Sequence, residues 1–77
     1  MNGMGSADHR LARRLGWALR WRRKIAGYSC STFAQKIGIS SEELAAYEAG
    51  ALRMSAEMMW RMAEALECSP ADLFEDV

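Results

Sequence analysis

The stretch from residue 29 to residue 50 constrains the fold of this 77-residue chain more than any other. Apolar residues recur at helical spacing in its first half, which predicts a short helix over about residues 30–37. Gly38 follows, where the C-cap of a helix requires a positive φ. Ser40 and Glu43 form the capping-box pattern that starts a second short helix, over about residues 41–48. The stretch therefore predicts two short helices joined by a tight turn.

Two such helices form a helix-turn-helix motif, whose second helix can enter the major groove of DNA. With its flanking residues, the motif resembles the Cro/phage-repressor-like (XRE) family of bacterial and phage transcriptional regulators. The resemblance runs from about residue 15 to residue 74 and is carried by Leu15, Gly16, Leu19, Arg20, Arg23, Gly27, Ser29, Phe33, Ala34, Ile37, Gly38, Ile39, Ser40, Leu44, Tyr47, Glu48, Gly50, Ala63, Leu66, Leu73 and Phe74.

The resemblance implies an all-α, compact, five-helix lambda-repressor-like domain. It also implies that Arg23 and Glu48 pair inside the domain and tie the first helix to the end of the recognition helix. The expected role of this pair is structural. No cofactor is implied.

A chain of this length forms one small domain, expected here over residues 8–77 after a disordered tail over residues 1–7. The first helix is expected over about residues 8–26. Ser55 predicts the start of a fourth helix, and the Ser69-Pro70 step with an acid at the third helical position predicts a short fifth one. The inner face of the fourth helix is expected to consist of Met59, Ala63, Leu66 and either Met62 or Trp60.

Several functional classes are disfavoured by composition. No apolar run approaches the ~20 residues of a membrane span, and no signal-peptide core is present, so a cytoplasmic location is expected. Cys30 and Cys68 do not form a Cys-x-x-Cys pair, which favours two reduced thiols over a disulfide or a metal site. A single histidine, His9, and the absence of a glycine-rich phosphate loop leave no catalytic constellation. The sequence thus predicts neither an enzyme nor a metal or small-molecule site.

The charges are divided along the chain although the formal net charge is zero. Residues 1–40 contain eight basic residues and one acid, for a net charge of +7. Residues 41–77 contain two basic residues and nine acids, for a net charge of −7. If this separation persists in space, one side of the molecule attracts phosphate and the other repels it.

Three segments are expected to contact DNA. The start of the second helix offers backbone N–H groups and hydroxyls to a phosphate, the exposed face of the third helix faces base edges, and the loop after Gly50 contacts the backbone again. These candidates are Ser29, Cys30, Ser31 and Thr32 in the first segment, Ser41, Glu42, Ala45 and Ala46 in the second, and Arg53 in the third. Helix capping alone also explains the serines.

The chain departs from the family pattern on this surface. Family members commonly have glutamine where Cys30 stands, bases or amides on the reading face, and a basic residue just after the glycine, where Ala51 and Leu52 stand here. A glutamate at position 42 can accept from a cytosine amino group, and an alanine at 45 or 46 can contact a thymine methyl group.

A second apolar face of the first helix has no assigned role. Counted at 100° per residue, Leu11, Ala18 and Leu19 lie near Leu15, whereas Trp17, Trp21 and Ile25 lie on a separate arc. These three residues either fold back onto the domain or form a surface for a second copy or a protein partner. Two hypotheses follow: a small sequence-specific regulator that binds double-stranded DNA as a homodimer, or a protein-interaction module of the same fold with weak or no DNA binding.

Overall fold

The protein folds into five α-helices, and the computed structural model describes the backbone of residues 6–74 and the side chains of residues 10–74. In chain order the helices are α1 (Ser6–Ile25), α2 (Cys30–Ile37), α3 (Ser41–Glu48), α4 (Ala56–Ala65) and α5 (Pro70–Leu73). No strand occurs in the described part of the chain, so the all-α, five-helix prediction is confirmed.

Serine side chains begin the four helices after α1. In each case the hydroxyl oxygen accepts a hydrogen bond from the backbone N–H three residues on, at 3.0–3.1 Å. The capping residues are Ser29, Ser40, Ser55 and Ser69. Such caps satisfy N–H groups that the helix itself cannot pair, and each stabilises its helix by about 1 kcal/mol. Gly38 ends α2 in the left-handed conformation, with φ of 82°, as its position predicts.

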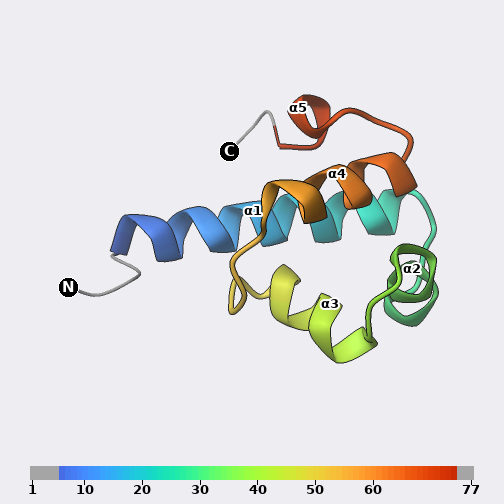
Figure 1. The fold of residues 1–77 in the computed structure, drawn as a ribbon, viewed down its shortest axis with the longest axis horizontal. Helices are drawn as coiled ribbons and strands as arrows, with labels where there is room; N and C mark the ends of the chain where they lie inside the picture. Colours follow the sequence, from blue (N-terminus) through green and yellow to red (C-terminus); the bar gives the residue numbers. More distant parts are fainter. Residues whose placement is uncertain (1–5, 75–77) are drawn as a thin grey trace.

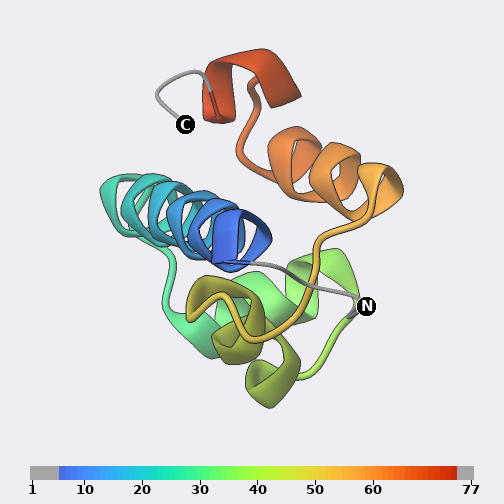
Figure 2. The ribbon, with the colours of Figure 1, turned by 90° about the vertical axis from the view of Figure 1, so that its left-hand side faces the viewer.

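The long helix α1 lies in the middle of the molecule, with α3 on one side and α5 on the other (Figures 1 and 2). Helix α1 contacts both of these helices, and α2 contacts α3 and α4. The core lies between them and is centred on four fully buried side chains, Leu19, Phe33, Leu44 and Met62. Because α3 packs with Leu44 and Tyr47 inward, its opposite face points away from the domain.

The structure differs from the sequence-based expectations at α1. The helix begins at Ser6, two residues before the expected start, so the last two residues of the expected tail are helical. The rest of that tail, residues 1–5, lies outside the described residues, as do the side chain of His9 and residues 75–77. Leu11, expected to face the core with Leu15, is 48% exposed, and Ala12 is buried instead.

Helix α4 resolves an alternative left open by the sequence. Met62 is fully buried and Trp60 is 62% exposed, so the methionine fills the core. Within the described residues, no helix is both long enough and apolar enough to cross a membrane.

Candidate nucleic-acid interface

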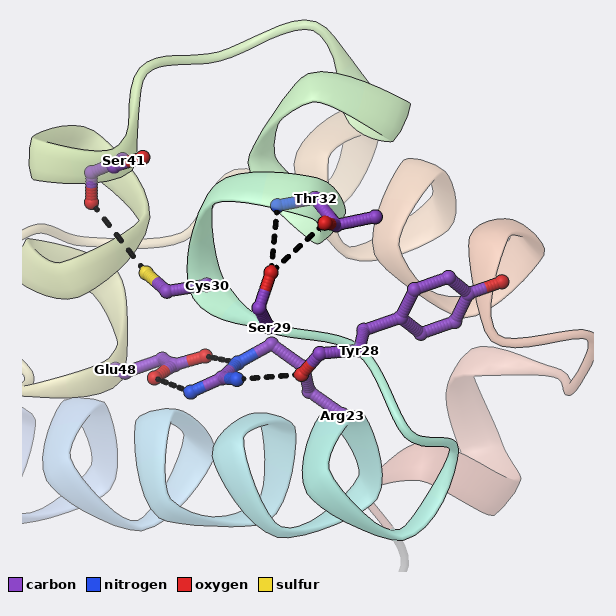
Figure 3. A network of polar contacts seen from close by, with 7 residues as sticks. All are labelled: Arg23, Tyr28, Ser29, Cys30, Thr32, Ser41 and Glu48. Atoms are coloured by element: carbon purple, nitrogen blue, oxygen red, sulfur yellow. Dashed lines mark hydrogen bonds and ion pairs between the residues drawn. The ribbon is translucent and has the colours of Figure 1, made fainter.

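A buried ion pair fixes the position of α3 against α1. The Arg23 guanidinium donates from Nε to Glu48 Oε2 at 2.6 Å and from Nη2 to Glu48 Oε1 at 3.0 Å (Figure 3). Both side chains are only 8% exposed. The structure therefore brings together the two residues whose pairing the family resemblance implied. A two-point contact of this kind restrains orientation as well as distance.

The same arginine also holds the start of α2. Its Nη1 donates to the backbone carbonyl of Tyr28 at 2.8 Å, so all three guanidinium nitrogens have protein partners. Hydrogen bonding to Glu48 raises the pKa of Arg23 above its usual value, although burial acts in the opposite direction. The side chain therefore stays charged and links α1, the start of α2 and the end of α3. The sequence did not predict the contact with Tyr28, because a backbone carbonyl carries no residue-specific signal.

The start of α2 is exposed and rich in hydroxyl groups. Ser29 caps the helix and donates to the hydroxyl of Thr32 at 2.8 Å, and Ser31 is exposed beside them. Among the hydrogen bonds of the described residues, the backbone N–H groups of Cys30 and Ser31 have no protein acceptor. Free N–H groups at a helix N-terminus, where the helix dipole is positive, suit a phosphate oxygen.

Cys30 differs from its neighbours because its side chain points inward. Its thiol lies 3.7 Å from the backbone carbonyl of Ser41, toward which it can donate a weak hydrogen bond (Figure 3). The thiol is free and half-buried. Any contribution of Cys30 to phosphate binding would thus come from its backbone N–H, while the side chain joins α2 to the start of α3.

The outward face of α3 contains the four residues expected to meet base edges. Glu42 and Ala45 are exposed, and Ser41 and Ala46 are half-buried. Glu43 is also exposed, and only its backbone N–H takes part in the cap, by donating to Ser40. None of the described hydrogen bonds is donated to its carboxylate, so the reciprocal half of the capping box, from the Ser40 backbone N–H to Glu43, is not formed. The reading face therefore displays two carboxylates and no positive charge.

The loop after α3 is anchored at both ends and presents Arg53 between the anchors. The carbonyl of Ala46 accepts from the N–H of Ala51 at 2.8 Å, and Met54 is buried in the core. Arg53 is exposed. A fixed loop with one outward guanidinium is suited to a single phosphate contact.

The structure adds Arg13 to the basic residues near this loop. A methyl group placed on Gly50 would lie 2.7 Å from Cγ of Arg13, so the stem of Arg13 packs directly on the glycine. Apart from this contact, Arg13 is exposed. The glycine after α3 was the available sequence signal, since its missing side chain permits this close approach.

The remaining candidates, Trp17, Trp21 and Ile25, do not fold back onto the core. Their side chains are 61%, 56% and 66% exposed, respectively. The two indole rings stack on each other, with centroids 6.4 Å apart and planes inclined by 17°. They lie on α1 and are separate from the α2, α3 and loop residues described above.

The chain is similar to several helix-turn-helix proteins. The family pattern described as "Helix-turn-helix domain" matches residues 14–75. The chain is 30% identical over 63 residues to the uncharacterized HTH-type transcriptional regulator y4aM of Sinorhizobium fredii, a match that covers 82% of this chain and 44% of the relative. The chain thus spans less than half the length of that relative.

Solved structures extend the similarity to the fold. The clp gene regulator ClgR from Corynebacterium glutamicum superposes with a TM-score of 0.82 at 30% identity, covering 86% of this chain and 85% of that one. The restriction-modification controller protein C.AhdI from Aeromonas hydrophila superposes with a TM-score of 0.78 at 28% identity, covering 82% of this chain and 96% of that one. With four-fifths of its length matched, the chain belongs to the helix-turn-helix domain family and is an XRE-like member of it.

Proposed function

We propose that this protein is a transcriptional regulator that binds double-stranded DNA as a homodimer, with α3 in the major groove. The observation that carries the proposal is the outward face of α3, which is held in place by the buried Arg23–Glu48 pair and left uncovered by the rest of the domain. The regulators with which the chain shares its fold support it, and such regulators are not a class of enzyme. The proposed role places the protein in the cytoplasm, with access to DNA.

The groups around α3 support contacts to the phosphate backbone. The N–H groups at the start of α2 come before α3 in the chain, Arg53 lies in the loop after α3, and Arg13 packs against Gly50 at the start of that loop. Contacts of this kind position a protein on the duplex without reading its sequence. A dimer would repeat them on two half-sites about one helical turn, roughly 34 Å, apart.

Sequence preference would come from Glu42 and Ala45, the two most outward candidates on α3. A carboxylate only accepts hydrogen bonds, so it suits the amino group of cytosine and is repelled by acceptor edges such as guanine O6 and N7. An alanine methyl group suits the methyl group of thymine. We therefore propose half-sites in which a cytosine faces Glu42.

Fluorescence polarisation on a labelled duplex tests the proposal. The full chain is titrated into random-sequence duplex at 50 mM and 200 mM salt, and bound sequences are then selected from a randomised pool. We expect affinity that falls with salt and selected sites in two related halves. Glu42→Gln should change the base selected at one position in each half, whereas the matched change Glu57→Gln, on α4, should not. An absence of salt-sensitive binding at micromolar protein would contradict the proposal.

A second candidate function is a protein-interaction module that binds DNA weakly or not at all. Two observations favour it: the reading face displays Glu42 and Glu43 without a base, and the stacked Trp17 and Trp21 are exposed. The selection from the randomised pool separates the two candidates, because an interaction module would select no sequence and any weak, salt-sensitive binding it showed would be equal on all duplexes.

A further inference from the structure

A groove between α1 and α5 exposes apolar side chains that the DNA-binding proposal does not use. Its volume is about 670 Å³, and its apolar lining includes Trp17 and Trp21 from α1 and Leu73 from α5. The two tryptophans are 61% and 56% exposed, and Ile25, one turn further along α1, is 66% exposed. At the usual size of such side chains, Trp17, Trp21 and Ile25 leave roughly 300–400 Å² of apolar area in water. An apolar patch of this size on a soluble domain often marks a binding surface.

Both walls of the groove are held in place by the rest of the domain. Leu73 is 3% exposed and packs in the core, which anchors α5. Arg22 Nη2 donates a hydrogen bond to the backbone carbonyl of Asp72 at 2.9 Å, which joins α1 to α5 directly. The groove is therefore formed in the free protein. A preformed surface binds its partner without the cost of ordering its own elements.

The charge of the groove is mainly positive. Three arginines, Arg13, Arg14 and Arg22, line it against a single acid, Asp72. Among the described residues the buried pair between α1 and α3 is the one ion pair present, so no described carboxylate pairs with these three guanidinium groups. Over residues 10–25, α1 contains no acid. A partner that carries negative charge is therefore attracted to this surface, and a basic one is repelled.

An acidic protein segment fits this surface better than a nucleic acid does. A nucleic-acid strand stacks its bases on open aromatic faces, whereas Trp17 and Trp21 stack on each other, with ring centroids 6.4 Å apart. Its phosphates would also be repelled by Asp72, which lines the same groove. A protein segment can instead place aliphatic side chains against the indoles and Leu73, and carboxylates against the arginines. Tryptophan and arginine are also the residues most often found at the energetic centre of protein interfaces.

The groove suits a helix rather than an extended strand. No strand occurs in the described part of the chain, so no sheet edge is present to which a strand could be added. An apolar strip between two helices is the kind of surface that binds the apolar face of an amphipathic helix. The α1 residues that line the groove run from residue 13 to residue 22, which corresponds to about 14 Å along the helix axis. A helix of about three turns covers this length.

We propose that the α1–α5 groove binds an acidic amphipathic helix of another protein. Apolar side chains of that helix pack on Trp17 and Trp21, and its carboxylates pair with the exposed Arg14 and with the other arginines of the groove. Helices α5 and α3 lie on opposite sides of α1 in both views, so the groove is separate from the proposed DNA-reading face (Figures 1 and 2). The inference goes beyond the proposed function and does not depend on it.

Selection from a displayed library of random peptides, each of about 15 residues, tests the inference with the full chain as the target. We expect the enriched peptides to be acidic, with apolar residues spaced i, i+3 or i+4, and i+7. The most enriched peptide is then synthesised with a fluorescent label and titrated by polarisation. Its Kd should rise at least about tenfold for Trp21→Ala and for Arg14→Glu.

A charge exchange tests the pairing itself. A second version of the peptide carries lysine at each acidic position. It should bind the wild-type chain at least about tenfold more weakly than the acidic peptide does, and this ratio should shrink for Arg14→Glu, because the reversed charge repels carboxylates and attracts ammonium groups.

Matched controls separate these effects from damage to the fold. Trp60→Ala removes a tryptophan of α4 that is 62% exposed and does not line the groove. Arg20→Glu reverses another exposed charge of α1 outside the groove. Both should leave the peptide Kd within about twofold of the wild-type value at 150 mM salt. Circular dichroism melts of all variants establish that they are folded at the measuring temperature.

A selection that enriches no peptide, or enriches neutral or basic ones, would overturn the inference. Peptides that bind Trp21→Ala as tightly as the wild type would overturn it too, as would an oligothymidylate strand that displaces the peptide and binds more tightly. Sedimentation equilibrium covers the remaining occupant: a wild-type dimer that Trp21→Ala dissociates would assign the groove to a second copy instead.

The DNA titration is independent of these results. Salt-sensitive DNA binding without any acidic peptide would refute the inference and leave the proposed function standing. Peptide binding that requires Trp21, in a chain that does not bind DNA, would do the reverse.

Discussion

Replacement of Glu48 by alanine is the strongest test of how α3 is held in place. The change removes the carboxylate that accepts from two nitrogens of Arg23, whose side chain is 8% exposed. The guanidinium keeps its hydrogen bond to Tyr28 but becomes a buried charge without a counter-charge. Loss of one partner from a buried pair costs about 3–5 kcal/mol of unfolding free energy.

This cost is large for so small a domain. At the usual ~0.05–0.15 kcal/mol per residue, a chain of this length is stable by about 4–12 kcal/mol in total. We therefore expect Glu48→Ala to lower the melting temperature by at least 12 °C or to leave the chain partly unfolded at 25 °C, at about 4–8 °C per kcal/mol.

Urea unfolding followed by circular dichroism measures the effect as a change in midpoint at constant slope. Glu64→Ala is the matched control, since that exposed glutamate of α4 takes part in no described ion pair, and it should shift stability by at most about 0.5 kcal/mol. The double change Arg23→Met with Glu48→Leu should recover most of the loss, because neither charge is then buried alone. A loss below about 1 kcal/mol for Glu48→Ala would refute the argument that the pair fixes α3.

Four further outcomes are expected. Gly16→Ala should cost about 1–3 kcal/mol in urea unfolding, because the added methyl group would meet the backbone carbonyls at the end of α3 and force the helices apart. Ser40→Ala should cost about 1 kcal/mol in the same assay, since it removes the cap of α3. Arg53→Ala should weaken DNA binding equally on all sequences and reduce the slope of log affinity against log salt by about one, measured by polarisation. Because the pKa of Arg23 is raised, its stabilising contribution is complete below the unfolded-state pKa and is lost only as the pH rises through the still higher folded-state value. The stability difference between the wild type and the double change at Arg23 and Glu48 should thus stay constant from pH 6 to pH 10.

The helix starts could be predicted because their causes are local. Each serine cap acts through a hydrogen bond to an N–H three residues on, so Ser40 and Ser55 could be recognised without knowledge of any other helix. Which face of a helix is buried depends on neighbours that are distant in sequence. The buried face of α1 is centred on Ala12 and Leu19 because Gly16 lets the end of α3 approach closely, and this turns Leu11 toward solvent.

The candidate interface could be predicted where the family resemblance or the helical spacing determines a role. The pairing of Arg23 with Glu48 followed from the family resemblance, and the exposed Glu42 followed from the periodicity of α3. Hydrogen bonds from a side chain to a backbone carbonyl could not be predicted, because every residue has such a carbonyl. The thiol of Cys30 lies against such a carbonyl of α3, and the approach of Arg13 to Gly50 appears only when α1 and the loop are both in place.

The two exposed acids on α3 have opposite effects on stability and on binding. Glu42 and Glu43 lie in the first turn of the helix, where a carboxylate is favoured by the helix dipole. On a DNA surface the same charges repel phosphate, so the attraction must come from the start of α2 and from Arg53 and Arg13. A reading face that attracts DNA weakly can still discriminate strongly between bases. A carboxylate placed against a hydrogen-bond acceptor on a base loses more binding free energy than the absence of a contact would. The proposed regulator would therefore select its site mainly by rejecting guanine opposite Glu42. Glu42→Ala should accordingly raise affinity for random duplex and reduce the difference between selected and random sites.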